Sequence, residues 1–309
     1  MESHDVVIVG GGPAGLGAAR RLVDLGVTDV AVLERELEAG GIPRHCGHVG
    51  FGWQSHRRLW TGPHFAARLR GDSQGLDVRT GTAVLELRKN GLLRIRNAKS
   101  VMEMTAKRIL IATGTRETPR AARLVGGSRP QGVMTTGALQ QHVYLRHIKP
   151  FERPVIIGSE WVSFSALLTC RHLGIRSVAM LEENRRITAP RGGGLVARLA
   201  FGVPVLTATK LIAIEGHRQV EAVEIETHGK RRHIACDGVI FTGQFRPENA
   251  LFMAGPFESA DLSPRIDVNF RCTEPAYFAA GNVLGPLKNS GKCWQQGVAA
   301  AEAIAGSLK

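Results

Sequence analysis

The sequence predicts an α/β protein of two domains, each with a parallel sheet flanked by helices, the second domain inserted in the first. Three observations predict this. An apolar run, a glycine-rich turn and a helical segment follow one another at 5–25, the order of a parallel strand and its crossover helix. The same order returns at 155–173 after a constant shift of 148 residues. Each copy later returns a strand that ends in Thr-Gly, at 113–114 and at 242–243.

The composition fits a folded chain of this size. With 309 residues, 43% of them hydrophobic and 22% charged, the chain is long enough for about two domains and too apolar for disorder. No stretch reaches the ~20 apolar residues that a membrane helix needs, so we expect no membrane span. No basic leader precedes the first strand, so we expect a cytoplasmic protein.

Charge and cysteine usage narrow the function classes. The net charge is +13, from 40 Lys and Arg against 27 Asp and Glu. These basic residues are spread along the chain without a nucleic-acid motif, which favours an anionic cofactor or an acidic protein partner over nucleic acid. The five cysteines are odd in number, widely spaced and form no CxxC. That pattern argues against a disulfide framework, a zinc ribbon and a dithiol redox pair, and we expect no metal.

The repeat also sets the expected domain boundaries. We predict that residues 1–118 and 255–309 form the first domain and residues 119–254 the second, with a crossing between them at 119–154. The expected elements of the first domain are strands at 5–9, 29–33 and 276–280, a meander at 82–87, 92–96 and 102–105, and helices at 16–25 and 294–305.

A Gly-x-Gly-x-x-Gly fingerprint lies between the first strand and the first helix. Gly10 allows the tight turn, Gly12 lets a pyrophosphate approach the backbone, and Gly15 lets helix and strand pack closely. The helix N-terminus then offers unpaired N–H groups and a positive dipole end to phosphate. Glu34 follows at the end of the next strand, where it can accept the ribose hydroxyls of an adenosine. The fingerprint therefore predicts a dinucleotide.

The second copy of the fingerprint is degenerate. Glu160 stands where the second glycine belongs and Ser163 where the third belongs, although Glu182 keeps the position of the ribose acid. A carboxylate at 160 would lie in the first helical turn, satisfy its N–H groups and repel a pyrophosphate. We expect a nucleotide-binding scaffold that has lost its dinucleotide, so binding of NAD(P) is doubtful.

The stretch Ala39–Gly71 contains no acidic residue but five Arg, four His and several aromatic residues. It is either a solvated basic face with aromatics packed beneath it or a wall of the cofactor site that doubles as an interaction surface. Cys46 lies in this loop, but a single cysteine cannot cycle as a dithiol, which favours a structural thiol.

These motifs together resemble the two-dinucleotide-binding-domain flavoproteins, the superfamily of glutathione reductase and thioredoxin reductase. Two stretches, 40–52 and 158–174, resemble more closely the FAD-type subunit of opine oxidases, D-hydroxyproline dehydrogenase and hydrogen cyanide synthase. The resemblance implies FAD at the first fingerprint and a last helix that points at the flavin. It makes Cys46, His48 and Lys292 candidate catalytic residues. The cofactor-binding residues that we expect are Gly10, Gly12, Pro13, Ala14, Gly15, Glu34, Arg35, Gly41, Ala83, Thr113, Gly114, Gly281, Asn282 (where the superfamily has Asp) and Lys292.

The resemblance also implies a function. It indicates an FAD-dependent oxidoreductase, the electron-transferring subunit of a multi-subunit dehydrogenase that acts on an amino acid or opine-type amine such as D-hydroxyproline. The implied partners are an amino-acid-oxidase-like flavoprotein and, on another polypeptide, a small [2Fe–2S] subunit. Two alternatives stay open: a stand-alone NAD(P)H-dependent flavin reductase, and a scaffold that binds an adenine nucleotide without redox chemistry.

Overall fold

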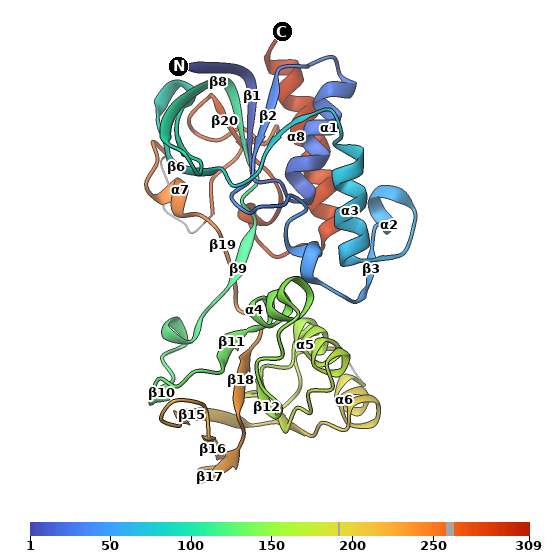
Figure 1. Ribbon diagram of the computed structural model, residues 1–309, viewed down its shortest axis with the longest axis vertical. Coiled ribbons are helices and arrows are strands. Elements are labelled where there is room, and N and C mark those ends of the chain that lie inside the picture. The colour runs from blue at the N-terminus through green and yellow to red at the C-terminus, as the bar shows by residue number, and fades with distance from the viewer. Residues whose placement is uncertain (191, 258–262) are drawn as a thin grey trace. The chain divides into compact units, whose positions relative to one another are not determined.

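The computed structural model describes residues 1–190, 192–257 and 263–309 (Figure 1). It has two compact units: the first comprises Met1–Arg44, Val49–Arg116 and Arg246–Lys309, and the second His45–His48 and Glu117–Phe245. Strands and helices alternate in both units, so the predicted α/β class is confirmed. None of the described helices has the length and apolar content that crossing a bilayer requires.

The first unit is built on a seven-stranded sheet in the order β5-β2-β1-β8-β7-β6, with β20 also paired to β8. Strands β5, β2, β1, β8 and β20 are parallel, and β7 and β6 extend the sheet antiparallel. The strands are β1 (Glu2–Val9), β2 (Val30–Leu33), β5 (Asp77–Arg79), β6 (Ala83–Leu87), β7 (Leu92–Arg96), β8 (Val101–Ile111) and β20 (Tyr277–Ala279).

Strand β8 differs from the sequence prediction. The meander strand at 102–105 and the strand before Thr113 were expected separately, but they form one strand. Its first half pairs with β7 and its last three residues pair with β20 on the same edge. The hydrogen bonds of two different partners thus keep one long strand extended.

Helices cover one face of the first sheet. In Figure 1, α1 (Pro13–Asp24), α3 (Gly62–Asp72) and α8 (Ser290–Ser307) lie together beside the strands. Residues alternate along β1, so Val6 and Ile8 pack under these helices, whereas Val7 and Val9 pack on the other face, over β6 and β7. The remaining elements of this unit are α2 (Trp53–His56), α7 (Ala250–Met253) and the ribbon of β3 (Val49–Phe51) with β4 (Trp60–Thr61).

The second unit repeats the plan with a five-stranded parallel sheet in the order β11-β18-β12-β13-β14. Its helices pack against one face and an antiparallel sheet, which β10 joins in parallel, against the other. The elements are β10 (Gly126–Gly127), β11 (Val133–Thr135), α4 (Thr136–Gln140), β12 (Pro154–Ile157), α5 (Trp161–His172), β13 (Ala179–Leu181), α6 (Gly193–Phe201), β14 (Val205–Leu206), β15 (Thr209–Glu215), β16 (Ala222–Thr227), β17 (Lys230–Ala235) and β18 (Gly238–Phe241).

The chain changes unit earlier than predicted. The expected crossing at 119–154 contains β10, β11 and α4 of the second unit, and the change occurs instead beside the pairing of β9 (Thr115–Glu117) with β19 (Phe245–Pro247). The units differ from the predicted domain ranges at 45–48, which belongs to the second unit. They also differ at 246–254, which belongs to the first unit. Glu248 explains this difference: its N–H donates to the Gly114 carbonyl at 2.9 Å, and its carbonyl accepts from the Thr113 hydroxyl at 2.8 Å.

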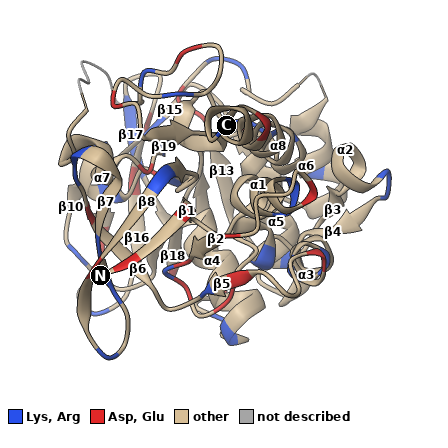
Figure 2. Cartoon of the chain, turned by 90° about the horizontal axis from the view of Figure 1, so that it is seen from above, with Lys and Arg blue, Asp and Glu red and all other residues tan. Residues whose placement is uncertain are grey.

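Basic residues occur on many elements of both units, with acidic residues among them (Figure 2). Many of the cations are paired, for example Arg79 with Glu2 and Asp77. The Arg79 guanidinium, by its hydrogen bond, holds the pKa of Glu2 at about 2. The charge distribution is therefore typical of a solvated surface rather than of a nucleic-acid track.

Candidate functional site

The glycine turn of the first unit is required by close packing at two of its three glycines. A Cβ atom at Gly10, where φ is +111°, would lie 2.5 Å from the carbonyl oxygen of Ala112. One at Gly15 would lie 1.9 Å from the carbonyl oxygen of Gly10. At Gly12, however, the nearest atom would be the Cα of Gly41 at 3.8 Å. The missing side chain at residue 12 thus leaves open space above the start of α1.

The start of α1 is suited to an anion. Gly12 is the N-cap and makes no side-chain capping bond, and Pro13 holds the first turn in helical geometry. The N–H groups of Ala14 and its neighbours therefore point outward without an intrahelical partner. Because the space in front of them is open, these residues fit the pyrophosphate of a dinucleotide.

Glu34 lies directly after β2, where the sequence predicts the adenosine ribose. Its carboxylate is 7% exposed, and each oxygen accepts one backbone bond at 2.9 Å, from Gly11 and from Glu36. An ionised carboxylate has about four acceptor positions, so about two stay available for ribose hydroxyls. The N–H of Thr82 donates to the Glu34 carbonyl at 2.9 Å, which places Ala83, the first residue of β6, at the same end of the sheet.

Two of the expected contacts take different positions around this turn. Gly41, with φ at +63°, lies against Gly12, because a Cβ there would be 2.9 Å from the Gly12 Cα. Arg35 is exposed and lies 3.8 Å from the carboxylate of Glu248. The structure thus brings Gly41 to the pyrophosphate side of the turn, whereas the Arg35 guanidinium is directed to an acid of its own unit.

The C-terminal segment lies close to α1. Gly281, with φ at +82°, would place a Cβ 3.0 Å from the Cβ of Ala14. The side chain of Asn282 is engaged internally: its Oδ1 accepts from the Lys288 N–H at 2.7 Å, and its Nδ2 donates to the Lys288 carbonyl at 3.0 Å. Asn282 therefore fixes the loop before α8. Lys292 is exposed in the first turn of that helix, and its N–H is capped by the Asn289 side chain at 2.9 Å.

The structure argues against Cys46 as a reactive thiol. The side chain is 7% exposed, and burial raises the pKa of the Cys46 thiol to about 12. Its sulfur lies 3.5 Å from the amide oxygen of Gln140 in the second unit. His48 belongs to the same short segment of that unit, whereas Lys292 belongs to the first. The three candidate catalytic residues therefore do not come from one unit.

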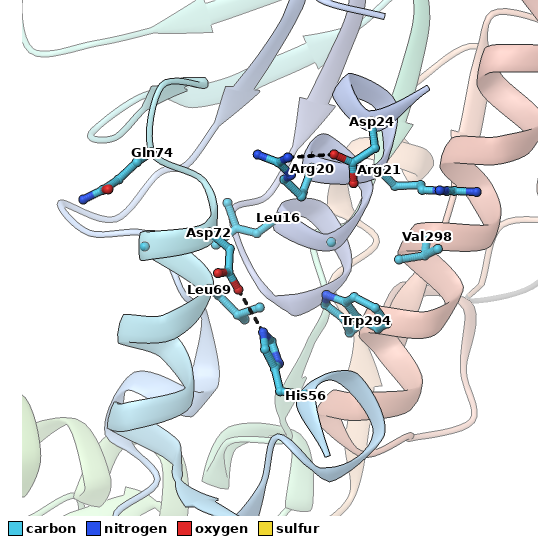
Figure 3. Close-up of a pocket in the computed structure, with 12 residues that line it drawn as sticks. Leu16, Arg20, Arg21, Asp24, His56, Leu69, Asp72, Gln74, Trp294 and Val298 are labelled. Carbon is cyan, nitrogen blue, oxygen red and sulfur yellow. Dashed lines mark hydrogen bonds and ion pairs between the residues drawn. The ribbon is translucent and has the colours of Figure 1, made fainter. Parts of the chain in front are cut away.

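A cavity of about 480 Å³ lies elsewhere in the first unit, between α1, α3 and α8 (Figure 3). Its polar lining residues include two pairs, Arg20 with Asp24 and His56 with Asp72, each at 2.8 Å. Arg21, also in the lining, pairs with Glu302 at 2.7 Å. The indole of Trp294 covers one side. None of the expected cofactor-binding residues lines this cavity.

In the second unit, Glu160 fills the position of the bare glycine. It is the N-cap of α5 but makes no side-chain bond to the helix N–H groups, so the predicted capping role is wrong. The carboxylate turns toward the sheet instead, where it accepts from the hydroxyls of Thr242 at 2.8 Å and Ser163 at 3.1 Å. Cβ atoms at Gly158 and Gly243 would each lie 2.5 Å from its oxygens. The side chain thus occupies the space that stays open in the first unit.

Glu182, at the ribose-acid position, is saturated by its own chain. It is 4% exposed and accepts four hydrogen bonds: from the Ser159 hydroxyl, from the Thr188 hydroxyl at 3.1 Å, and from the N–H and side-chain amide of Asn184 at 2.9 and 2.7 Å. Burial raises the pKa of the Glu182 carboxyl, but these bonds outweigh burial and hold that pKa below its usual range. No acceptor position is left for a ribose hydroxyl.

The donors that close this second site were not predicted from the sequence. Ser159 had a signal, because it occupies the position of Gly11 in the repeat. Asn184 likewise stands at the position of Glu36. Thr242 belongs to the repeated Thr-Gly pair, but that pair predicted a strand end and no donor. Thr188 lies in a segment that the repeat does not cover closely, so no sequence pattern pointed to it.

A model of one protein family, described as pyridine nucleotide-disulphide oxidoreductase, matches residues 4–302. The chain belongs to this family. Its members are flavin-dependent oxidoreductases that bind FAD, so the predictions of a flavin enzyme and of FAD as its cofactor are confirmed. Within the family, the position of the FAD on this chain stays a prediction that the open turn at Gly12 supports.

Relatives within the family differ in activity by name. Dihydrolipoyl dehydrogenase of Manduca sexta is 27% identical over 98% of this chain and 68% of its own length. One opine oxidase subunit, from Rhizobium meliloti strain 1021, is 25% identical over 59% of this chain, and the match covers 39% of its own length. Among solved structures, thioredoxin reductase of T. acidophilum superposes with a TM-score of 0.82 at 21% identity, covering 99% of both chains. That likeness shows the two-domain fold.

Proposed function

We propose that this chain is the FAD-dependent, electron-transferring subunit of a multi-subunit dehydrogenase for an amino acid or opine-type amine. One observation carries the proposal: the two units differ at the glycine turn. The turn at Gly12 is open in the first unit, whereas in the second unit Glu160 fills the corresponding space and the hydrogen-bond acceptors of Glu182 are all used. Because the second unit is closed to a nicotinamide nucleotide in its described residues, the proposed source of electrons for the FAD is another redox protein. An amine-oxidising partner subunit supplies them.

The residues of the first unit divide the work of holding the cofactor. The N–H groups behind Gly12 receive the pyrophosphate, and Glu34 receives the adenosine ribose. Gly281 and Asn282 fix the loop that leads to α8, whose N-terminus faces the flavin in the superfamily that the chain resembles. Bound FAD supplies reversible storage of electrons, and the chain supplies binding and electrostatics. Lys292 would add a positive charge to the helix terminus, which would favour negative charge on a group bound there.

The proposed partners follow from the relatives. The matching opine oxidase chain is by name one subunit of a larger enzyme. We propose an amino-acid-oxidase-like flavoprotein as the component that oxidises the substrate, a D-hydroxyproline- or proline-like amine. A small [2Fe–2S] protein is the proposed further carrier. The net charge of +13 suits acidic partners.

A stand-alone NAD(P)H-dependent reductase is the second candidate, and dihydrolipoyl dehydrogenase supports it by matching nearly the full chain. The filled second site disfavours it. The cysteines also disfavour disulfide chemistry, since all five are free and buried. Family membership favours redox chemistry over the third alternative, a scaffold without it.

Anaerobic reduction of the purified, FAD-loaded chain tests the proposal. We expect the flavin absorbance near 450 nm to persist when NADH or NADPH is added, and to bleach when an amine substrate is added together with the partner flavoprotein. Bleaching by either nicotinamide alone would establish the reductase. Bleaching by amine without any partner would also refute the proposal.

A further inference from the structure

Helix α6 of the second unit turns three large apolar side chains toward solvent, whereas Phe201 at its end packs against the core. Leu195 is 61% exposed, Val196 48% and Leu199 74%. Ala197 is the one buried residue of the helix. A crossover helix normally places its largest apolar residues against the sheet, so the orientation of α6 needs another explanation.

Contacts at both ends hold helix α6 in this orientation. Glycines in left-handed conformation bound the helix at both ends, Gly192 with φ at +93° and Gly202 with φ at +68°. At its start, a Cβ on Gly193 would lie 3.1 Å from the ring of Phe164 in α5. At its end, the N–H of Val203 donates to the carbonyl of Ala197 at 3.1 Å. These contacts attach both ends of α6 to its own unit in this orientation.

The apolar surface continues onto α5. Trp161, the first residue of that helix, is 71% exposed. Its indole packs edge-on to Phe164 with ring centroids 6.2 Å apart. Phe164 in turn contacts the start of α6 at Gly193. Trp161, Leu195, Val196 and Leu199 together are called the α6 face below. An exposed apolar face of this kind marks a contact with another molecule.

The surroundings of the α6 face are basic. No Asp or Glu occurs from residue 184 to residue 214. Arg185, Arg186 and Arg198 are exposed there, and none of them forms an ion pair within the described part of the chain. A second copy of this chain would set these cations against each other across a twofold axis. An acidic rim on a different protein would complement them.

The face adjoins the closed nucleotide site. Trp161 directly follows Glu160, and the segment that carries Thr188, a donor to Glu182, leads into α6. The α6 face therefore lies on the same stretches of chain as the residues that close the nucleotide site. A surface that no longer has to admit a nucleotide can bind a protein instead.

We propose that the α6 face docks the amine-oxidising flavoprotein, through a surface on that partner that is apolar at its centre and acidic at its rim. The inference rests on the proposed function and adds the place of contact. Protein interfaces commonly have this arrangement of an apolar core and a polar rim.

The test compares two double variants that each add two carboxylates. Leu195→Glu/Leu199→Glu changes the α6 face, and Leu37→Glu/Val268→Glu changes two side chains of the first unit that are 85% and 94% exposed. Each is co-expressed with the flavoprotein that copurifies with the wild type. We expect the first variant to weaken the complex by at least about 30-fold, with FAD content and melting temperature unchanged. The control variant should retain the complex.

Hydrogen exchange gives a second readout, in which the amides of α6 should exchange more slowly in the complex than in the isolated wild-type chain. A stoichiometric complex formed by Leu195→Glu/Leu199→Glu, or unchanged exchange in α6, would refute the docking site alone. If the wild type copurifies with no flavoprotein, the proposed function itself fails. Two other occupants of the α6 face would also overturn the proposal. One is a membrane, if the wild type sediments with phosphatidylglycerol–phosphatidylcholine vesicles and Leu195→Glu/Leu199→Glu does not. The other is a second copy of the chain, if the isolated wild type dimerises and this variant does not.

Discussion

Ser159 donates a hydrogen bond to the carboxylate of Glu182, at the position where the backbone N–H of Gly11 donates to Glu34 in the first unit. The backbone bond from residue 184 to Glu182 likewise matches the bond from Glu36 to Glu34, both at 2.9 Å. The second copy thus keeps donors at both positions and adds side-chain donors from other residues. Because these donors use all its acceptor positions, the Glu182 carboxylate has a structural role, whereas Glu34 can still accept bonds from a ligand.

Gly12 and Gly15 are expected to respond differently to alanine. A Cβ at residue 12 has no close neighbour, so Gly12→Ala should fold normally and bind FAD more weakly. Gly12→Glu should abolish binding because its side chain would fill the pyrophosphate position. A Cβ at residue 15 would overlap the Gly10 carbonyl oxygen, so Gly15→Ala should lower the melting temperature. Flavin absorbance and thermal melts check both, and full yellow colour in Gly12→Glu would contradict the site.

Lys292 is expected to tune the flavin. It adds an exposed charge to the first turn of α8, and charges near a helix terminus are worth about 0.3–1 kcal/mol. Lys292→Met should therefore lower the two-electron flavin potential by roughly 6–20 mV. Lys107→Met is the control, because Lys107 pairs with Asp5 at 2.7 Å. An unchanged potential in a spectroscopic titration of Lys292→Met would place the lysine away from the flavin.

The thiols are expected to be inert in the folded protein. All five cysteines are buried, and burial raises the pKa of Cys46 and Cys272 to about 12 and of Cys170 to about 11. Thiolate is the reactive form, so the native chain should react slowly with Ellman's reagent at a pH of about 8 and release five equivalents of dye after denaturation. Cys46→Ala should leave flavin reduction intact. Rapid labelling of one native thiol would identify a reactive cysteine.

The sequence predicted the elements that follow from periodicity and glycine spacing. Strand β1, helix α1 and the position of Glu34 come from local pattern, and the offset of the repeat located Glu160 and Glu182. The direction of the Glu160 side chain was not predictable, because Thr242, the donor that attracts it, lies 82 residues away, directly after β18. The exposure of α6 was equally hidden, since leucine spacing describes an amphipathic helix without saying which side meets the sheet.

Glu182 is expected to stabilise the second unit in a pH-dependent way. Glu182→Gln would set an amide donor against donors of Ser159, Asn184 and Thr188, at a cost of about 1–3 kcal/mol. The folded-state pKa of Glu182 is lowered, so its contribution is full above the ordinary value of 4.5 and is lost as pH falls through the folded pKa. Melts near neutral pH should separate wild type from variant, and melts well below the ordinary pKa should bring them together. A constant difference would contradict the linkage.

The second unit is expected to recover nucleotide binding only when both Glu160 and the donors to Glu182 are changed. Glu160→Gly would clear the space beside Gly158 and Gly243 but would leave Glu182 with all four acceptor positions occupied. We therefore expect this single variant to bind ADP-ribose no better than the wild type does. Adding Ser159→Gly and Thr188→Ala frees two acceptor positions on one oxygen of Glu182, so the triple variant should gain measurable affinity.

Calorimetric titration with ADP-ribose separates these outcomes, and Ser159→Gly/Thr188→Ala without the change at 160 is the control. That control frees the ribose acid while the Glu160 carboxylate still fills the pyrophosphate position. Two like charges about 4 Å apart repel by roughly 1 kcal/mol even in bulk water and by more near a protein surface, so the control should stay weak. Tight binding by Glu160→Gly alone would show that the saturation of Glu182 is no barrier. Tight binding by the wild type would remove the reason for assigning the electrons to a partner protein.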